Sequence, residues 1–255
     1  TGHRPSKTAF CPGSPVIRRP VSFQRRLMDD DDYDDGMYPV FEEIDFGRIH
    51  TLFRSLSLFD DMYLNMQGMN IALIDQFITE WEYALLQEYI DMERTPLDTA
   101  MFVSAQSQMW IFALYELLRT WRSRINKLIK WKENGGIAQV LKNIEKDHLN
   151  LAAHFRKSHL EKLRDDPAFV NALQSDSKLL DGVFSMTAAI RINLAKHEIQ
   201  GKDNSIPRAP GYGRINPWCG ALNFEIEHKD NSFEYINRRD IAEALRKIEI
   251  PNRES

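Results

Sequence analysis

The strongest constraint on the fold is a long stretch, residues 97–134, that contains neither glycine nor proline. Thr95 as N-cap and Pro96 at the first helical position predict where a helix begins, and Gly135 with Gly136 predicts where it ends. Its apolar residues recur every three or four positions, as on one face of a helix: Ile111, Leu114, Leu118, Trp121, Ile125 and Leu128. At about 1.5 Å per residue, one helix here exceeds about 50 Å, a length that leaves room for a bend or a break.

Three further stretches show the same periodicity, residues 67–93, 137–164 and 177–201. In the last of them the mostly apolar stripe consists of Leu180, Val183, Thr187, Ile190 and Leu194. Short connections between long amphipathic helices favour antiparallel neighbours. We therefore predict a mainly α protein, an up-and-down four-helix bundle, in which a shorter helix near residues 49–59 forms an N-terminal helical extension.

The pattern changes beyond Gly201. Residues 221–227 and 233–236 alternate between apolar and polar side chains, with turn-forming residues between them. This alternation predicts a β-hairpin over residues 221–236, and Asn237 is expected to cap a final short helix. Because a two-stranded hairpin buries too little surface to stand alone, we expect it to pack against the bundle.

Residues 1–36 are expected to form a charged tail outside a single domain of residues 37–250. The first 28 positions hold basic residues and no acid, and aspartates dominate residues 29–35. Such blocks are typical of a solvated tail, and contact between the basic half and a nucleic acid is the alternative.

Composition narrows the classes of partner. The formal net charge of −4 gives no general attraction to nucleic acid or to an anionic membrane, so any such binding requires a local patch. Two cysteines, Cys11 and Cys219, lie far apart without redox or metal-ligand spacing, which favours a reducing, cytoplasmic location. No run of about 18 apolar residues is present, so we expect no membrane-spanning helix and no membrane partner.

An arginine, an amide and an imidazole gather at the end of the predicted helix 177–201. Asn193 and His197 are four residues apart and share a face, and Arg191 precedes them. A histidine in the last turn of a helix is favoured in its protonated form by the helix dipole. These groups suit the binding and cleavage of a phosphodiester. In the alternative interpretation, Arg191 pairs with an acid and His197 caps the helix carbonyls.

This pattern, Arg191 followed after five residues by His197 at the end of a bundle's fourth helix, resembles the HEPN superfamily (higher eukaryotes and prokaryotes nucleotide-binding). The helix that holds Glu116 looks like that family's second helix, where an acidic residue commonly faces the site. The sequence departs from the family pattern in three places, the first being that five residues, rather than the more usual four, separate Arg191 from His197. Asn193 comes two positions after the arginine rather than directly after it, and Lys196 precedes the histidine where a small residue is common.

The resemblance, which covers roughly residues 67–201, implies a metal-independent endoribonuclease. The substrate 2′-OH would attack the neighbouring phosphate and leave a 2′,3′-cyclic phosphate and a 5′-OH. Arg191 would hold the phosphate, and His197 would act as general acid or base. Asn193 would orient the substrate or the histidine, and Glu116 would fix the arginine. Because the family's site is usually formed across a two-fold axis, the resemblance also implies a homodimer.

Further candidates for RNA contact are Arg119, Lys196, Tyr212 and Arg214. Tyr212 and Arg214 lie in a Gly/Pro loop, where they would stack on or clasp a base; the alternative is a turn that leads back to the hairpin. Glu116 and Arg119, three residues apart, are also spaced to pair along their own helix.

The resemblance implies a toxin or antiviral-defence ribonuclease, with an antitoxin or regulatory protein as partner. The alternative, from a different class, is a catalytically inactive helical module that binds a nucleotide or a partner protein. We expect no metal or cofactor. Glu145 and His148 have the Glu-x-x-His spacing of di-iron bundles, but the only other such pair, Glu225 and His228, falls in the predicted hairpin.

Overall fold

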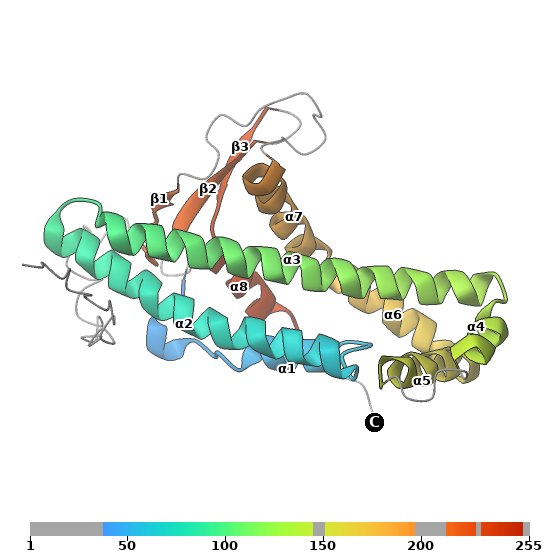
Figure 1. Ribbon diagram of the computed structural model, residues 1–255. Helices are drawn as coiled ribbons and strands as arrows, with labels where there is room; N and C mark the ends of the chain where they lie inside the picture. Colours follow the sequence, from blue (N-terminus) through green and yellow to red (C-terminus); the bar gives the residue numbers. More distant parts are fainter. Residues whose placement is uncertain (1–37, 145–150, 197–212, 228–230, 252–255) are drawn as a thin grey trace, which may run out of the picture. The chain divides into compact units, whose positions relative to one another are not determined.

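The protein is mainly α-helical, as its periodicity predicted, and carries a small antiparallel sheet (Figure 1). The computed structural model describes residues 38–144, 151–196, 213–227 and 231–251. These residues form the helices α1 (Arg48–Ser55), α2 (Met62–Met92), α3 (Leu97–Glu133), α4 (Ile137–Ile144), α5 (Leu151–Asp165), α6 (Pro167–Leu179), α7 (Asp181–Lys196) and α8 (Arg238–Lys247), a 3-10 turn at Phe41–Glu43, and the strands β1 (Arg214–Ile215), β2 (Leu222–Glu227) and β3 (Phe233–Ile236).

The two longest helices, α2 and α3, lie side by side and are joined by a short turn (Figure 1). Asp61 caps α2, because its carboxylate accepts hydrogen bonds from two backbone N–H groups of the first turn. α3 runs as one helix through the whole predicted stretch, without the break for which its length left room. The predicted N-cap Thr95 is wrong by one residue. Pro96 is the extended residue before the helix, and it makes no side-chain cap.

Residues 177–201, predicted as one helix, divide between α6 and α7. The break falls at Leu180, whose φ of −98° and ψ of 10° interrupt the helix. Asp166 caps α6 and Pro167 takes its first position, so this helix starts well before the predicted one. Gly201, the predicted end, lies outside the described residues. The stretch 137–164 corresponds to α4 and α5, on either side of the undescribed residues 145–150.

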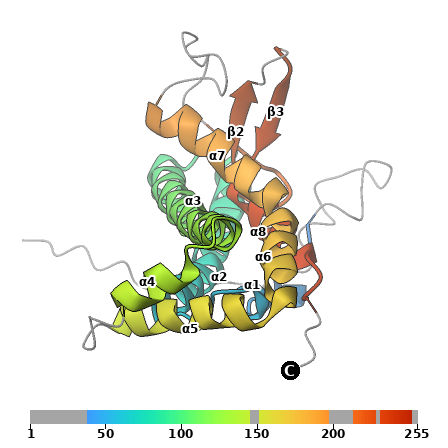
Figure 2. The same ribbon diagram turned by 90° about the vertical axis from the view of Figure 1, so that its right-hand side faces the viewer.

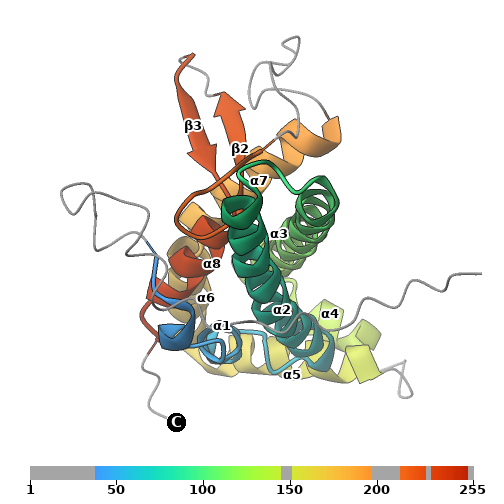
Figure 3. The ribbon, with the colours of Figure 1, turned by 90° about the vertical axis from the view of Figure 1, so that its left-hand side faces the viewer.

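The predicted β-hairpin is present as β2 and β3, which pair antiparallel with Phe224 opposite Ile236. β1 adds a third strand on the other edge of β2, in the order β1-β2-β3. Asn237 caps α8, as predicted. Its side chain accepts from the backbone N–H of Asp240, and the Asp240 carboxylate accepts from the backbone N–H of Asn237. Figures 2 and 3 show the hairpin beside α7 and leading into α8.

The larger of two apolar clusters in the described residues joins the helices to the sheet. The stripe predicted for α3 is buried, and Trp121 at its centre is closed to solvent. Its indole N–H donates to the Ser57 carbonyl oxygen at 2.8 Å, and its ring packs on Phe59, which stacks on Phe53. None of the described helices is both long and apolar enough to span a membrane.

At Gly220, the turn before β2 lies very close to the backbone of α2. Its φ is +75°, and an added Cβ would lie 1.8 Å from the Glu82 carbonyl oxygen. We therefore expect Gly220→Ala to lower the free energy of unfolding by more than about 2 kcal/mol, from backbone strain and overpacking. The matched control is Gly182→Ala in α7, where the added methyl group meets no atom within 4 Å. Because alanine is the better helix former, this control should stabilise by up to about 1 kcal/mol. Urea denaturation of both variants measures the difference, and equal losses would contradict the described turn.

Candidate functional site

Arg191, the arginine of the predicted site, lies on α7 where that helix packs on α3 (Figure 2). Its guanidinium carbon is 5.1 Å from the centre of the Tyr115 ring. The Tyr115 ring stacks on Phe184, with centres 5.4 Å apart and planes 14° apart. The guanidinium carbon of Arg122 lies 4.5 Å from the centre of the Phe184 ring. We call Arg191, Tyr115, Phe184 and Arg122 the arginine–aromatic row.

The two arginines of the row differ in their partners. Arg122 donates to the Asp181 carboxylate at 2.6 Å, which fixes its position at the start of α7. Arg191 has no carboxylate partner within the described ranges. A partly buried arginine that packs on a ring and has no counter-charge among the described residues is suited to an external anion.

Glu116, predicted to fix Arg191, instead accepts from Arg119 at 2.6–2.7 Å along its own helix. Both side chains are about half exposed, at 47% and 55%, so this pair is a surface feature. Asn193 is buried, and its amide donates to the Glu225 carbonyl oxygen at 2.7 Å. This hydrogen bond ties α7 to β2, while the Asn193 Oδ1 has no partner in the described part of the chain.

Of the remaining predicted residues, the structure describes the side chain of Arg214 alone. Arg214 is exposed in β1, where it pairs with Asn223. His197 and Tyr212 lie outside the described residues, as does the side chain of Lys196. Of the residues predicted to be catalytic, Arg191 is therefore the one whose described contacts belong to the row.

The motifs did not reveal the basic half of α3. Residues 117–132 contain no acid and six basic residues, Arg119, Arg122, Arg124, Lys127, Lys130 and Lys132. In a chain of net charge −4 this is a local patch of the kind that polyanion binding requires. The charge run was visible in the sequence. It alternates with the apolar stripe of the same helix, however, and so resembles an ordinary solvated face.

A cavity of about 450 Å³ opens on this half of α3. We call its lining the α3 basic surface: Arg119, Arg122, Ser123, Asn126, Lys127, Lys130 and Phe184. It holds four cationic side chains, and no carboxylate is among the described residues that line it. Arg122 and Phe184 belong to both the surface and the row, so Arg191 is linked to the cavity through continuous contacts. Cations combined with accessible rings are the groups that proteins use to hold single-stranded nucleic acid.

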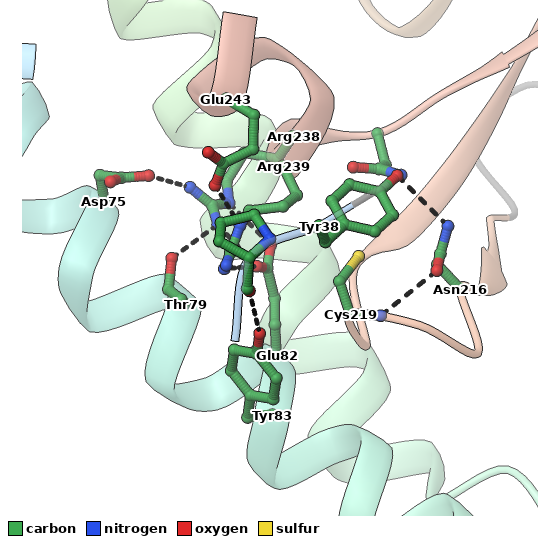
Figure 4. A network of polar contacts seen from close by, with 12 residues as sticks. Tyr38, Asp75, Thr79, Glu82, Tyr83, Asn216, Cys219, Arg238, Arg239 and Glu243 are labelled. Carbon is green, nitrogen blue, oxygen red and sulfur yellow. Dashed lines mark hydrogen bonds and ion pairs between the residues drawn. The ribbon is translucent and has the colours of Figure 1, made fainter. Parts of the chain in front are cut away.

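A second polar cluster joins α8 to α2 and is closed to solvent (Figure 4). Arg238 donates to both Glu82 carboxylate oxygens at 2.7 and 2.6 Å, to the Thr79 hydroxyl at 3.0 Å, and to Asp75. Burial disfavours the charged guanidinium, but Glu82 and Asp75 outweigh it and raise the pKa of Arg238 above its ordinary value. Arg238, Asp75 and Glu82 have no exposed side-chain surface, so a substrate does not reach them.

The same cluster contains two more arginines. Arg239 donates to Glu243 at 2.8 Å, and Arg246 donates to Glu243 at 2.7 Å and to Asp75. Three buried arginines thus face three carboxylates, counting Glu82, and the cluster is balanced in charge. We interpret it as the structural link between α8 and α2.

The described residues offer no site for a thiolate nucleophile or for a metal ion. Cys219 is buried, and burial raises the pKa of its thiol well above the ordinary value, which disfavours the nucleophilic thiolate. Within the described ranges, no group of three His, Cys, Asp or Glu side chains is placed to hold a metal ion. Comparison of the chain with protein-family models, with curated proteins and with solved structures gave no match.

The buried cluster between α8 and α2 predicts that its Arg–Glu pair contributes far more to stability than an exposed Arg–Glu pair does. Arg238→Ala leaves Asp75 and Glu82 buried without a counter-charge, so we expect the free energy of unfolding to fall by about 3–5 kcal/mol. Arg119→Ala breaks an exposed pair and should leave that free energy nearly unchanged. Guanidinium denaturation of both variants measures the contrast. A mild effect of Arg238→Ala would show that the cluster does not hold α8 in place.

The raised pKa of Tyr83 predicts that the protein loses stability at alkaline pH. Burial raises the pKa of Tyr83 to about 12, and its hydroxyl donates to the Pro39 carbonyl oxygen at 3.1 Å. The folded state therefore keeps this proton between pH 10 and about 12, while the unfolded state releases it. The free energy of unfolding should fall in that interval by at most about 1.4 kcal/mol per pH unit. Tyr83→Phe should show a shallower decline, and identical slopes in denaturation at pH 9 to 12 would rule out the shift.

Proposed function

We propose that the protein binds RNA on the α3 basic surface and cleaves it as a metal-independent endoribonuclease of the HEPN type. The arginine–aromatic row carries this proposal. It presents Arg191, which lacks a carboxylate partner in the described chain, in continuous contact with Arg122 and the basic cavity. Phosphates of the bound strand would lie on the cations of the α3 basic surface.

In this mechanism Arg191 binds the scissile phosphate and stabilises the charge that develops when the 2′-OH attacks. His197 accepts the 2′-OH proton or donates a proton to the departing 5′-oxygen. The products are a 2′,3′-cyclic phosphate and a 5′-OH. Asn193 lies one turn before the histidine in sequence, and its Oδ1, which has no partner among the described residues, would orient the imidazole or the substrate hydroxyl. Packing on Tyr115 limits the orientations of Arg191 before substrate arrives.

The proposal has an architectural and a biological part. α2, α3, the α4–α5 segment and the α6–α7 segment would correspond to the four helices of an up-and-down bundle. A homodimer would bring two Arg191–His197 pairs to one composite site. A cytoplasmic toxin or antiviral-defence ribonuclease, controlled by an antitoxin or regulatory protein, is the setting that the family resemblance supports.

A second candidate function, an inactive module that binds a partner protein, is favoured by one face of α2. That face exposes large apolar side chains at intervals of three and four residues, each 41–61% accessible: Met62, Met66, Met69, Leu73 and Phe77. Exposed apolar patches of this kind mark interfaces with other proteins. Under this alternative the protein would bind RNA weakly and would not cleave it.

Cleavage of a labelled single-stranded RNA by the purified protein in EDTA separates the two. We expect cleavage without metal, with cyclic-phosphate ends, and a loss of at least about 100-fold in both Arg191→Ala and His197→Ala. Arg122→Glu should also weaken RNA binding by about tenfold and flatten its salt dependence. Lys247→Glu, an equal charge change on an exposed residue of α8, is the control and should bind normally. Cleavage that requires magnesium, or that survives both alanine changes, contradicts the proposal.

A further inference from the structure

A second cavity, of about 490 Å³, lies where α3 meets α4 and α5. It falls within the volume range of small-molecule sites. No residue of the arginine–aromatic row lines it. Its polar lining among the described residues consists of Arg124, Lys127, Lys130, Arg156 and His159.

Two of the polar side chains around this cavity already have partners. Arg124 pairs with the buried carboxylate of Asp61 at 2.9 Å. His159 Nε2 lies 2.7 Å from an Asp60 carboxylate oxygen, and this hydrogen bond lowers the pKa of Asp60. These pairs fix the wall of the cavity, and Asp61 balances the charge of Arg124.

The other three cations have no such partner. Lys127, Lys130 and Arg156 are exposed, and no carboxylate pairs with them in the part of the chain that the structure describes. Among the described residues, three positive charges therefore border one cavity without a paired carboxylate. This arrangement favours an anion with two or more negative charges.

The rest of the lining is apolar. Leu128 and Leu160 are buried, and Trp131, Val140 and Ile144 are partly exposed while packing on the core. An inorganic ion gains nothing from such a wall. An organic anion gains free energy by placing its apolar body there while its charged group meets the cations. The Trp131 indole in particular offers a flat surface for a ring.

We propose that this cavity binds a small organic phosphate, a molecule of about mononucleotide size that combines a phosphate group with an apolar or aromatic body. Arg156, Lys127 and Lys130 would bind the phosphate, Arg156 through its planar guanidinium. Trp131 and the aliphatic residues of α4 would hold the body. This site is additional to RNA cleavage. Mononucleotides and short alkyl phosphates both combine a phosphate group with such a body.

Isothermal titration of the full chain with AMP, hexyl phosphate and inorganic phosphate tests the proposal. We expect at least one organic phosphate to bind with one site per chain, and inorganic phosphate to bind at least about tenfold more weakly. Preference for AMP identifies a nucleotide-like ligand, and preference for hexyl phosphate identifies a lipid-like one. The proposal is overturned if neither organic probe binds at millimolar concentration, or if inorganic phosphate binds equally well.

Substitutions of lining residues test whether the organic phosphate binds in this cavity. Arg156→Glu and Val140→Trp change residues that line this cavity and not the α3 basic surface. Each should reduce affinity for the organic phosphate at least about tenfold without changing RNA binding. Lys247→Glu is the control and should bind normally. Since Arg156 is exposed, its variant tests the site even where the larger tryptophan lowers stability. Binding that survives both changes overturns the proposal.

The RNA-binding proposal and the organic-phosphate proposal are contradicted by different results. Arg122→Glu lies on the α3 basic surface alone, so it should weaken RNA binding and leave organic phosphate binding intact. Loss of phosphate binding in Arg156→Glu with normal RNA cleavage supports both sites. Phosphate binding in a protein that never cleaves RNA supports this cavity and rejects the ribonuclease.

Discussion

The structure depends on six charged groups that are held out of water between α2 and α8. Removing Arg238 and its carboxylate partners from solvent costs several kcal/mol for each ion, and only their mutual contacts offset that cost. The contacts require a definite position of α8, because Arg238 must reach Glu82, Thr79 and Asp75 together. β3 leads directly into α8, so the cluster also limits where the sheet lies.

α3 packs against α8 and also carries the two surfaces for which we propose binding functions. One face of the helix supplies the core stripe around Trp121. Its outer half borders two cavities, and Lys127 and Lys130 lie on the ridge between them. A single uninterrupted helix thus holds the row and both cavities in a fixed order. Under the proposed functions, the absence of glycine and proline in this stretch matters for binding as well as for fold.

Local signals in the sequence were sufficient for much of the fold. The stripe of α3, the alternation of the hairpin and the capping box at Asn237 each depend on residues a few positions apart. The break at Leu180 was missed, because the apolar spacing continues across it. The buried cluster gave no local signal either, since Arg238 and Asp75 are 163 residues apart in sequence. Charged residues on an amphipathic helix are ordinarily assigned to its solvated face.

The same distinction applies to the candidate site. Arg191 was found from its motif, but its neighbours Tyr115 and Phe184 come from two helices whose packing no motif encodes. Glu116 was assigned to Arg191 by family pattern, whereas its own helix supplies Arg119 as a nearer partner. Local pairing therefore prevailed over the expected contact between helices.

The distance in sequence between the two halves of the buried cluster has a consequence for biosynthesis. While a nascent chain emerges from the ribosome, α2 and α3 are complete long before α8 exists. Until then Asp75 and Glu82 lack their cations, and the surface of α2 that carries them must stay hydrated. The last stage of folding therefore waits for translation of α8, and a ribosome that stalled before residue 238 would carry an unfinished core for chaperones and proteases to find.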